Sequence, residues 1–433
     1  MFELNFNKDK LTQEQLKEIE KNFKQSLNTI KEKITLEFNV LLLKSRTDLF
    51  AHVLSLFVQC DVHKVLQVTI SQLLDFLIDV ASNYTEAPYH NFYHAVDIVT
   101  VLYYFYHHLQ ADHYLTDVDK VFLMIAAICH DIGHPGFGNS FQVNTNTELA
   151  KRYGHTSTLE TYSVELTKEL IEKHKFNAYH LEMNQMIEKF ILSTDMIYHT
   201  KLTQQMNQLT TNLTSIINRK RKLDSIEPIS TLVNKEDRQS LCCILLHAAD
   251  ISNMARPYAV SQQWSNQIVK EFYSQGDEEK KRKMKISPGM DRESCSQRSI
   301  SLKFQETILP YFKSLVSLLP KSQLLVTCLE ENRTYWESNT IESIHHSTNN
   351  TTLLSPPPSS SLSTTINTAT IVTYKRIRLR YRSQSYPTVL YNKHFIIEKT
   401  NLLPLVHFKS SLLHDTTMKN NVESIVLYHP YDI

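Results

Sequence analysis

Residues 121–139 read VFLMIAAICHDIGHPGFGN and decide how this chain must fold. The first nine residues are uncharged and apolar without alternation, which predicts a helix buried on all sides. That run leads directly into His130 and Asp131, and His134 follows three residues later. Because an unpaired carboxylate in an apolar setting is costly, Asp131 needs a partner there. The stretch therefore predicts a functional centre at the end of a core helix.

Glycine is scarce in this chain, and its distribution points to the same loop. Only six glycines occur, and three of them, Gly133, Gly136 and Gly138, fall within HDIGHPGFGN. Glycine tolerates left-handed backbone angles and the close approach of neighbouring groups. We therefore expect unusual backbone angles or close packing in this loop.

Two further stretches place histidine and aspartate in apolar surroundings. PYHNFYHAVD contains His90 and His94, and LLHAADISN contains Asp250. If the first stretch is helical, His90 and His94 face one pocket, because residues four apart share a helix face. Singly, each histidine is more often an ordinary core or surface residue. The ordered set of imidazoles and carboxylates suits a divalent metal, however, and predicts a metallohydrolase.

Composition limits the range of functions. The 433 residues are 42% hydrophobic, so the chain can bury a large core, and 46 basic against 45 acidic residues leave a formal charge of +1. No bulk charge therefore favours nucleic acid or an anionic membrane, and a small-molecule substrate fits better. Six cysteines without a CxxC pair, no apolar leader and no stretch of the roughly 18 apolar residues of a spanning helix predict a cytoplasmic protein with free thiols.

The apolar periodicity elsewhere is helical, as in the stripe of Leu66, Ile70, Leu73 and Leu77. No convincing pair of alternating strands precedes residue 370. We therefore predict an all-α fold with mostly short connections.

The chain divides into three parts by pattern. At 1–45, Thr12 followed by Gln15 resembles a capping box, and apolar residues recur to Ile34, which predicts an amphipathic helix of about 25 residues. This helix either packs on its own domain or forms a homodimer or regulatory contact. Residues 46–344 form the main domain. Residues 345–433 are a Ser/Thr/Pro/Asn linker and a basic tail, which we expect to be largely disordered.

At this point the motifs resemble a known family. The order H…HD…D on a helical chain resembles the HD superfamily of metal-dependent phosphohydrolases. PYHNFYHAVD, HDIGHPGFGN and ADISN with a following RP are more closely similar to the catalytic domain of class I cyclic nucleotide phosphodiesterases. The resemblance runs from about Leu56 to Trp336, which is most of the chain outside the tail. It implies a compact multi-helix catalytic domain that hydrolyses cAMP, cGMP or both to the nucleoside 5′-monophosphate.

The resemblance also implies the roles of individual residues. His94, His130, Asp131 and Asp250 would bind Zn²⁺, and Asp131 would bridge to a second ion, Mg²⁺ or Mn²⁺. His90 would be the general acid that protonates the departing O3′. The matching positions for polar groups that orient ligands and waters are His134, Asn139, Glu160, Thr194 and Asp195.

The base pocket is where the chain departs from the family pattern. The resemblance places Asn253, Trp264, Ile268 and Phe304 around the base, although a Phe or Ile at helical spacing is more often a core residue. Ser301 stands where the family has a glutamine that hydrogen-bonds the purine. Losing one or two such bonds weakens binding by roughly 1 to 3 kcal/mol. Gln297 or Gln305 would substitute if the helix register shifts, and the choice between adenine and guanine stays open.

Three functional hypotheses follow. The first is an active cyclic nucleotide phosphodiesterase. The second, motivated by Ser301 and the unusual tail, is a catalytically impaired regulatory protein that binds metal and nucleotide. The third is an HD phosphohydrolase acting on another nucleotide phosphate, against which the YHN segment and the position of His90 both argue.

Overall fold

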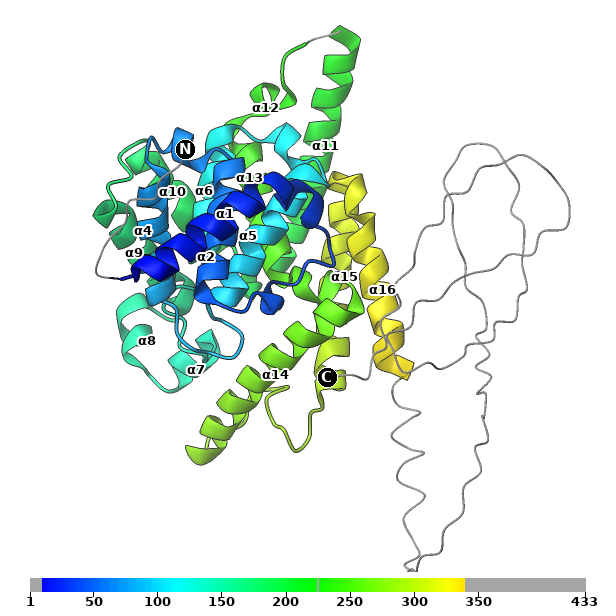
Figure 1. Ribbon diagram of the computed structural model, residues 1–433. Coiled ribbons are helices and arrows are strands. Elements are labelled where there is room, and N and C mark those ends of the chain that lie inside the picture. Colours follow the sequence, from blue (N-terminus) through cyan, green and yellow to red (C-terminus); the bar gives the residue numbers. More distant parts are fainter. Residues whose placement is uncertain (1–9, 224–225, 339–433) are drawn as a thin grey trace, which may run out of the picture. The chain divides into compact units, whose positions relative to one another are not determined.

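A computed structural model describes residues 10–223 and 226–338, and throughout these ranges the chain forms helices and connecting turns without a strand (Figure 1). The all-α expectation is thus confirmed. The α-helices are α1 Gln13–Lys33, α2 Arg46–Gln59, α3 Val62–Val65, α4 Ile70–Ser82, α5 Phe92–His107, α6 Asp117–Cys129, α7 Asn139–Asn144, α8 Glu148–Tyr153, α9 Thr158–Lys173, α10 His180–Leu192, α11 His199–Leu223, α12 Ile229–Leu232, α13 Lys235–Asp250, α14 Tyr258–Lys281, α15 Gln297–Leu318 and α16 Gln323–Ser338.

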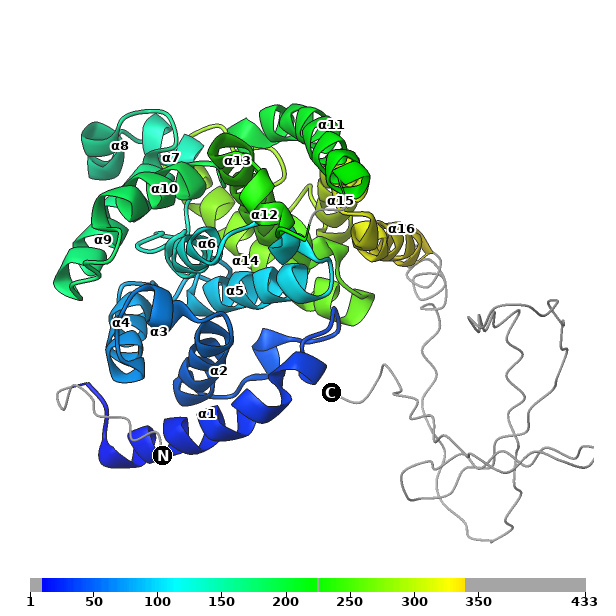
Figure 2. The same cartoon turned by 90° about the horizontal axis from the view of Figure 1, so that it is seen from above.

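Three helices form the centre of the fold. α5, α6 and α13 pack against one another, and each is rich in residues without charge, so that most of their side chains are buried (Figure 2). His94 lies in the first turn of α5, His130 directly follows α6, and Asp250 is the last residue of α13. Because these three helices converge, their ends bring ionisable groups into the core, as residues 121–131 predicted for α6.

The N-terminal helix packs on its own domain. Its capping box is present, since Thr12 and Gln15 exchange backbone and side-chain hydrogen bonds. Its buried residues, which include Ile19 and Phe23, belong to the main hydrophobic core, and α1 lies against α2 (Figure 2). Its apolar face is therefore largely covered within the chain, and a homodimer through this helix stays a prediction.

One sequence expectation about the core needs correction. Leu66 does not continue the stripe of α4, because it ends the short helix α3. Gln67 then adopts a left-handed backbone with φ of 55°, and Thr69 opens α4 with a capping box to Gln72. The chain therefore turns between α3 and α4 at a point where the apolar spacing alone suggested a single continuous helix.

None of the described helices combines the length and the apolar character needed to cross a membrane. The predicted linker and basic tail at 345–433 lie outside the described residues.

Candidate metal centre

Four side chains from three separate segments meet in the core. Their nearest ligand atoms all lie within 4.8 Å of one another, and they are His94, His130, Asp131 and Asp250. Nε2 of His94 is 3.0 Å from Oδ1 of Asp250 and 3.5 Å from Oδ2 of Asp131. Nε2 of His130 is 2.9 Å from Oδ2 of Asp131 and 3.4 Å from Oδ1 of Asp250. The structure thus brings together all the residues expected to bind metal.

The donor set fits a divalent cation. Nδ1 of His130 donates to the carbonyl of Ala127 at 2.9 Å, which leaves Nε2 as the atom that points at the carboxylates. That Nε2 is buried and makes no hydrogen bond of good geometry. Two imidazole nitrogens and two carboxylates in one small volume match the ligands that zinc and related metals take.

The carboxylates of this cluster are held in their charged form. Burial alone would raise the pKa of Asp131, but the imidazoles of His130 and His90 outweigh it and bring that pKa well below its usual range. Burial also acts to raise the pKa of Asp250, and the neighbouring imidazoles of His130 and His94 outweigh it and lower that pKa. Anionic oxygens are what a cation requires at this point.

His90 does not sit on the helix that carries His94. Asn91 is the N-cap of α5, its side chain accepts from the backbone N–H of Tyr93 at 2.9 Å, and His90 therefore lies in the preceding loop. The expectation of a shared helix face was wrong for this pair. The two rings are nevertheless 5.8 Å apart, and the ring of His90 stacks on that of His134 at 4.0 Å.

Glu271 is a site residue that the sequence analysis missed. From α14 it accepts the backbone N–H groups of Tyr89 at 2.9 Å and His90 at 3.1 Å, and it hydrogen-bonds Nδ1 of His90. Burial lowers the pKa of His90, but Glu271, Asp131 and Asp250 outweigh it and raise that pKa to about 9. The signal was present, since Glu271 lies on the same helical stripe as Ile268 and Trp264.

The glycine loop partly follows expectation. Gly133 and Gly136 have φ of 81° and 78°, values that L side chains rarely adopt. A Cβ on Gly133 would also come within 2.6 Å of the ring of Tyr162. Gly138 shows neither condition, because its φ is −69° and an added Cβ would meet no atom closer than 3.8 Å. Its N–H donates to Gln275 on α14 at 2.9 Å, which ties the loop to the same helix as Glu271.

The expected polar neighbours form a second layer. Nδ2 of Asn139 donates to Glu160 at 2.9 Å, and burial together with the carboxylate of Asp195 raises the pKa of Glu160 to about 7. Burial lowers the pKa of His134 to about 3, so this imidazole is neutral, and its Nδ1 accepts the N–H of Gly136. The hydroxyl of Thr194 donates to the carbonyl of Ile191 at 2.8 Å and is thus bonded within its own turn.

The expected base contacts lie on three elements, namely the 3-10 turn Ile251–Ala255, α14 and α15. Asn253 donates to the hydroxyl of Tyr89, whose ring centroid is 4.5 Å from that of His94. Trp264 is fully buried 5.7 Å from Tyr89, and Ile268 packs against this aromatic group. Asn253 and Trp264 therefore support the wall of the metal cluster. Phe304 is only partly buried.

The hydroxyl of Ser301 is not available to hydrogen-bond a purine. Ser301 is buried, and its hydroxyl is 2.7 Å from that of Ser265. Gln297 lies one turn earlier on α15 and donates to the same Ser265 hydroxyl at 3.1 Å. Gln305 lies one turn later, is 3% exposed, and leaves both amide atoms without a hydrogen bond. The helix register thus places both alternative glutamines on the same side as Ser301.

Comparison with known proteins points in one direction. A sequence profile described as 3′5′-cyclic nucleotide phosphodiesterase matches residues 89–329. The chain is 30% identical over 303 residues to the 3′,5′-cyclic-nucleotide phosphodiesterase regA of Dictyostelium discoideum, covering 68% of this chain and 36% of that protein. It is 28% identical over 305 residues to the cGMP-specific 3′,5′-cGMP phosphodiesterase 3 of the same organism, covering 68% and 62%. The chain thus spans less than two thirds of either relative.

Among solved structures, the fold is similar to LmjPDEB1 in complex with IBMX. The TM-score is 0.66 at 23% identity, and the match covers 77% of this chain and 99% of that one. This likeness concerns the fold alone.

Proposed function

This chain belongs to the class I 3′,5′-cyclic nucleotide phosphodiesterase family, and on that premise we propose that it hydrolyses cAMP, cGMP or both to the nucleoside 5′-monophosphates. The observation that carries the proposal is the convergence of His94, His130, Asp131 and Asp250 beside a histidine that is positioned to donate a proton. Termination of cyclic nucleotide signalling would follow from this activity.

The four converging side chains would hold the metal. We assign His94, His130, Asp131 and Asp250 to a tightly held Zn²⁺, and Asp131 also to a second ion, Mg²⁺ or Mn²⁺. Bound there, divalent ions would neutralise charge on the phosphate and make a water nucleophilic at neutral pH. The unbonded Nε2 of His130 and the charged carboxylates support this assignment.

His90 is the group we propose as general acid. Its Nδ1 is engaged by Glu271, so Nε2 is the atom left to donate a proton to the departing O3′. A pKa of about 9 keeps the imidazole protonated at neutral pH. Glu271 fixes the ring, and it also anchors the loop through the N–H groups of Tyr89 and His90.

The neighbouring polar groups have supporting roles in this proposal. Neutral His134 stacks on His90 and limits the ring's freedom, whereas Asn139, Glu160, Thr194 and Asp195 would order waters next to Asp131. Around the base, we propose Ile268 and Phe304 as the apolar contacts. Asn253, Trp264 and Ser301 would shape the pocket from behind, since the structure has them bonded or buried.

Ser301 also supports a second candidate function, that of a catalytically impaired protein that binds metal and nucleotide. The Ser301 hydroxyl is occupied by Ser265, so it offers little to a purine edge. A chain that binds metal and nucleotide but turns substrate over poorly would have this arrangement.

The expected cytoplasmic location also stays a prediction, which the six unpaired cysteines support.

Turnover by the full chain distinguishes these functions. The protein is incubated with cAMP and with cGMP in Mg²⁺ or Mn²⁺, and the monophosphates are separated by chromatography. We expect hydrolysis of at least one substrate, and a His90→Ala variant that loses roughly 100-fold or more in kcat while keeping its metal content. The exposed His155→Ala serves as the matched control. Absence of hydrolysis by a metal-loaded chain would favour the impaired, regulatory function.

A further inference from the structure

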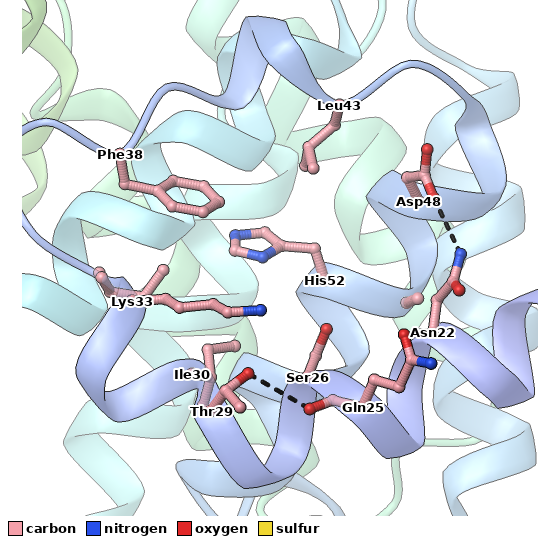
Figure 3. Close-up of a pocket in the computed structure, with 12 residues that line it drawn as sticks. Asn22, Gln25, Ser26, Thr29, Ile30, Lys33, Phe38, Leu43, Asp48 and His52 are labelled. Atoms are coloured by element: carbon pink, nitrogen blue, oxygen red, sulfur yellow. Dashed lines mark hydrogen bonds between the residues drawn. The ribbon is translucent and has the colours of Figure 1, made fainter. Parts of the chain in front are cut away.

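A pocket of about 280 Å³ lies between α1 and α2, outside the metal centre (Figure 3). Its walls come from α1, from the segment between the two helices, and from α2, which contributes Asp48, Ala51 and His52. The volume is near the lower limit of small-molecule sites, and enough for a ligand of one ring with short substituents.

His52 presents a hydrogen-bond acceptor to this pocket. The hydroxyl of Thr100 donates to the carbonyl of Val96 at 2.7 Å, so its 2.9 Å contact with Nε2 of His52 requires that Nε2 carry the proton. Nδ1 of His52 then carries a lone pair that accepts no hydrogen bond from the described residues. The His52 side chain is only 6% exposed. Burial lowers the pKa of His52 to about 4, which keeps this acceptor neutral.

Lys33 supplies a positive charge at the same place. It lies in the last turn of α1, and its side chain runs across the pocket with the ammonium toward the His52 side (Figure 3). Within the described part of the chain it forms no ion pair. Asp48 lies at the other end of the pocket, where Asn22 donates to its carboxylate at 2.9 Å. The ammonium of Lys33 is therefore available to pair with an anionic group of an occupant.

Apolar side chains form much of the remaining wall, together with the polar side chains of Asn22, Gln25, Ser26 and Thr29. Phe38 stacks on His52 with ring centroids 4.9 Å apart and planes 9° from parallel, and Ile30 and Leu43 line the space beside them. A flat apolar body would extend this stack, with an anionic group at Lys33 and a donor to Nδ1 of His52. We propose that the pocket binds a small aromatic carboxylate that carries a hydroxyl group.

The pocket wall is joined to the metal centre. Arg256, which is buried, donates to the carbonyls of Phe38 and of Leu36, the latter at 2.8 Å, and pairs with the buried Asp97 at 3.1 Å. Only the 3-10 turn Ile251–Ala255 separates Arg256 from Asp250. An occupant that fixes Phe38 would therefore also alter turnover, a consequence that rests on the proposed phosphodiesterase function.

Calorimetric titration of the full chain tests the site. The probes are the three isomeric hydroxybenzoates, the hydroxybenzamides that lack the charge, and benzoate, which lacks the donor. We expect at least one hydroxybenzoate to bind, with its amide and benzoate roughly tenfold weaker. Absence of heat and of thermal stabilisation for every hydroxybenzoate at millimolar concentration would overturn the proposal.

Variants locate the binding. Lys33→Gln, at an exposed position that should not disturb folding, is expected to weaken the hydroxybenzoate about tenfold. Lys31→Gln, on the same turn but outside the pocket, should leave affinity unchanged. Equal affinities for the two variants would overturn the assignment, whereas loss in Ser26→Phe, which fills the pocket, would support it. Binding without any cyclic nucleotide turnover would refute the proposed function and leave this site standing.

Discussion

His90 and Glu271 share a hydrogen bond between Nδ1 and a carboxylate oxygen, although 181 positions separate them in the sequence. The same carboxylate accepts the backbone N–H groups of Tyr89 and His90 through its other oxygen. Glu271 thus sets both the orientation of the His90 ring and the path of the loop that carries it. Burial acts to raise the pKa of Glu271, but His90 outweighs it and lowers that pKa to about 2.

Glu271→Gln should therefore lower kcat more than it raises KM, because the amide keeps the shape but not the charge. Since His90 has a pKa of about 9, its proton is present below that pH and lost above it. Removing the charge of Glu271 lowers this pKa, so the alkaline decline in activity should move to lower pH. Rate profiles between neutral and alkaline pH check this, and an unshifted profile would mean that Glu271 does not control His90.

Asp250→Asn should reduce bound metal, since it removes an anionic ligand from the convergence of α5, α6 and α13. We expect at least tenfold weaker metal affinity, together with a lower Tm, because binding energy and folding energy are linked. Metal content by elemental analysis, with melting curves in the presence and absence of a chelator, measures both. The exposed Asp277→Asn is the control. Full metal occupancy in Asp250→Asn would contradict the assignment of this ligand.

His52 should make stability depend on pH. Its pKa is about 4 in the folded chain against an ordinary 6.5, so between these values the unfolded chain binds more protons. The free energy of unfolding should fall as pH drops from 6.5 to about 4, by roughly 3 kcal/mol from this residue. The other charged residues that line the same pocket as His52 are Lys33 and Asp48.

Urea unfolding at a series of pH values gives the slope. His52→Gln should flatten the dependence in this window, and the exposed His155→Gln should leave it as it is. An identical slope in the parent chain and in His52→Gln would show that another group is responsible.

Gln305→Leu should stabilise the protein, because the two unbonded amide atoms are buried at a cost. We expect a gain of about 1 to 2 kcal/mol in the free energy of unfolding, with no change in KM. Gln297→Leu, which breaks the bond to Ser265, is the comparison and should bring no gain. A marked rise in KM for Gln305→Leu would instead assign its amide to the nucleotide.

The fold class and the candidate cluster of imidazoles and carboxylates were predictable because both follow from short-range patterns. The uncharged run at 121–129 could only be buried, and its end had to bring His130 and Asp131 into the core. The capping box at Thr12 set the start of α1 for an equally local reason. The boundary between α3 and α4 was missed, since a left-handed residue at Gln67 interrupts an apolar spacing that continues through it.

The amino-acid sequence by itself determined that the chain is helical, that its core helices end in imidazoles and carboxylates, and to which family it belongs. The tertiary structure alone decided three pairings. Glu271 hydrogen-bonds His90, the hydroxyls of Ser265 and Ser301 hydrogen-bond each other, and Arg256 links the N-terminal segment to Asp97. The physical reason is range. Helix formation and burial depend on residues a few positions apart, whereas these pairings join side chains that become neighbours only when whole helices pack.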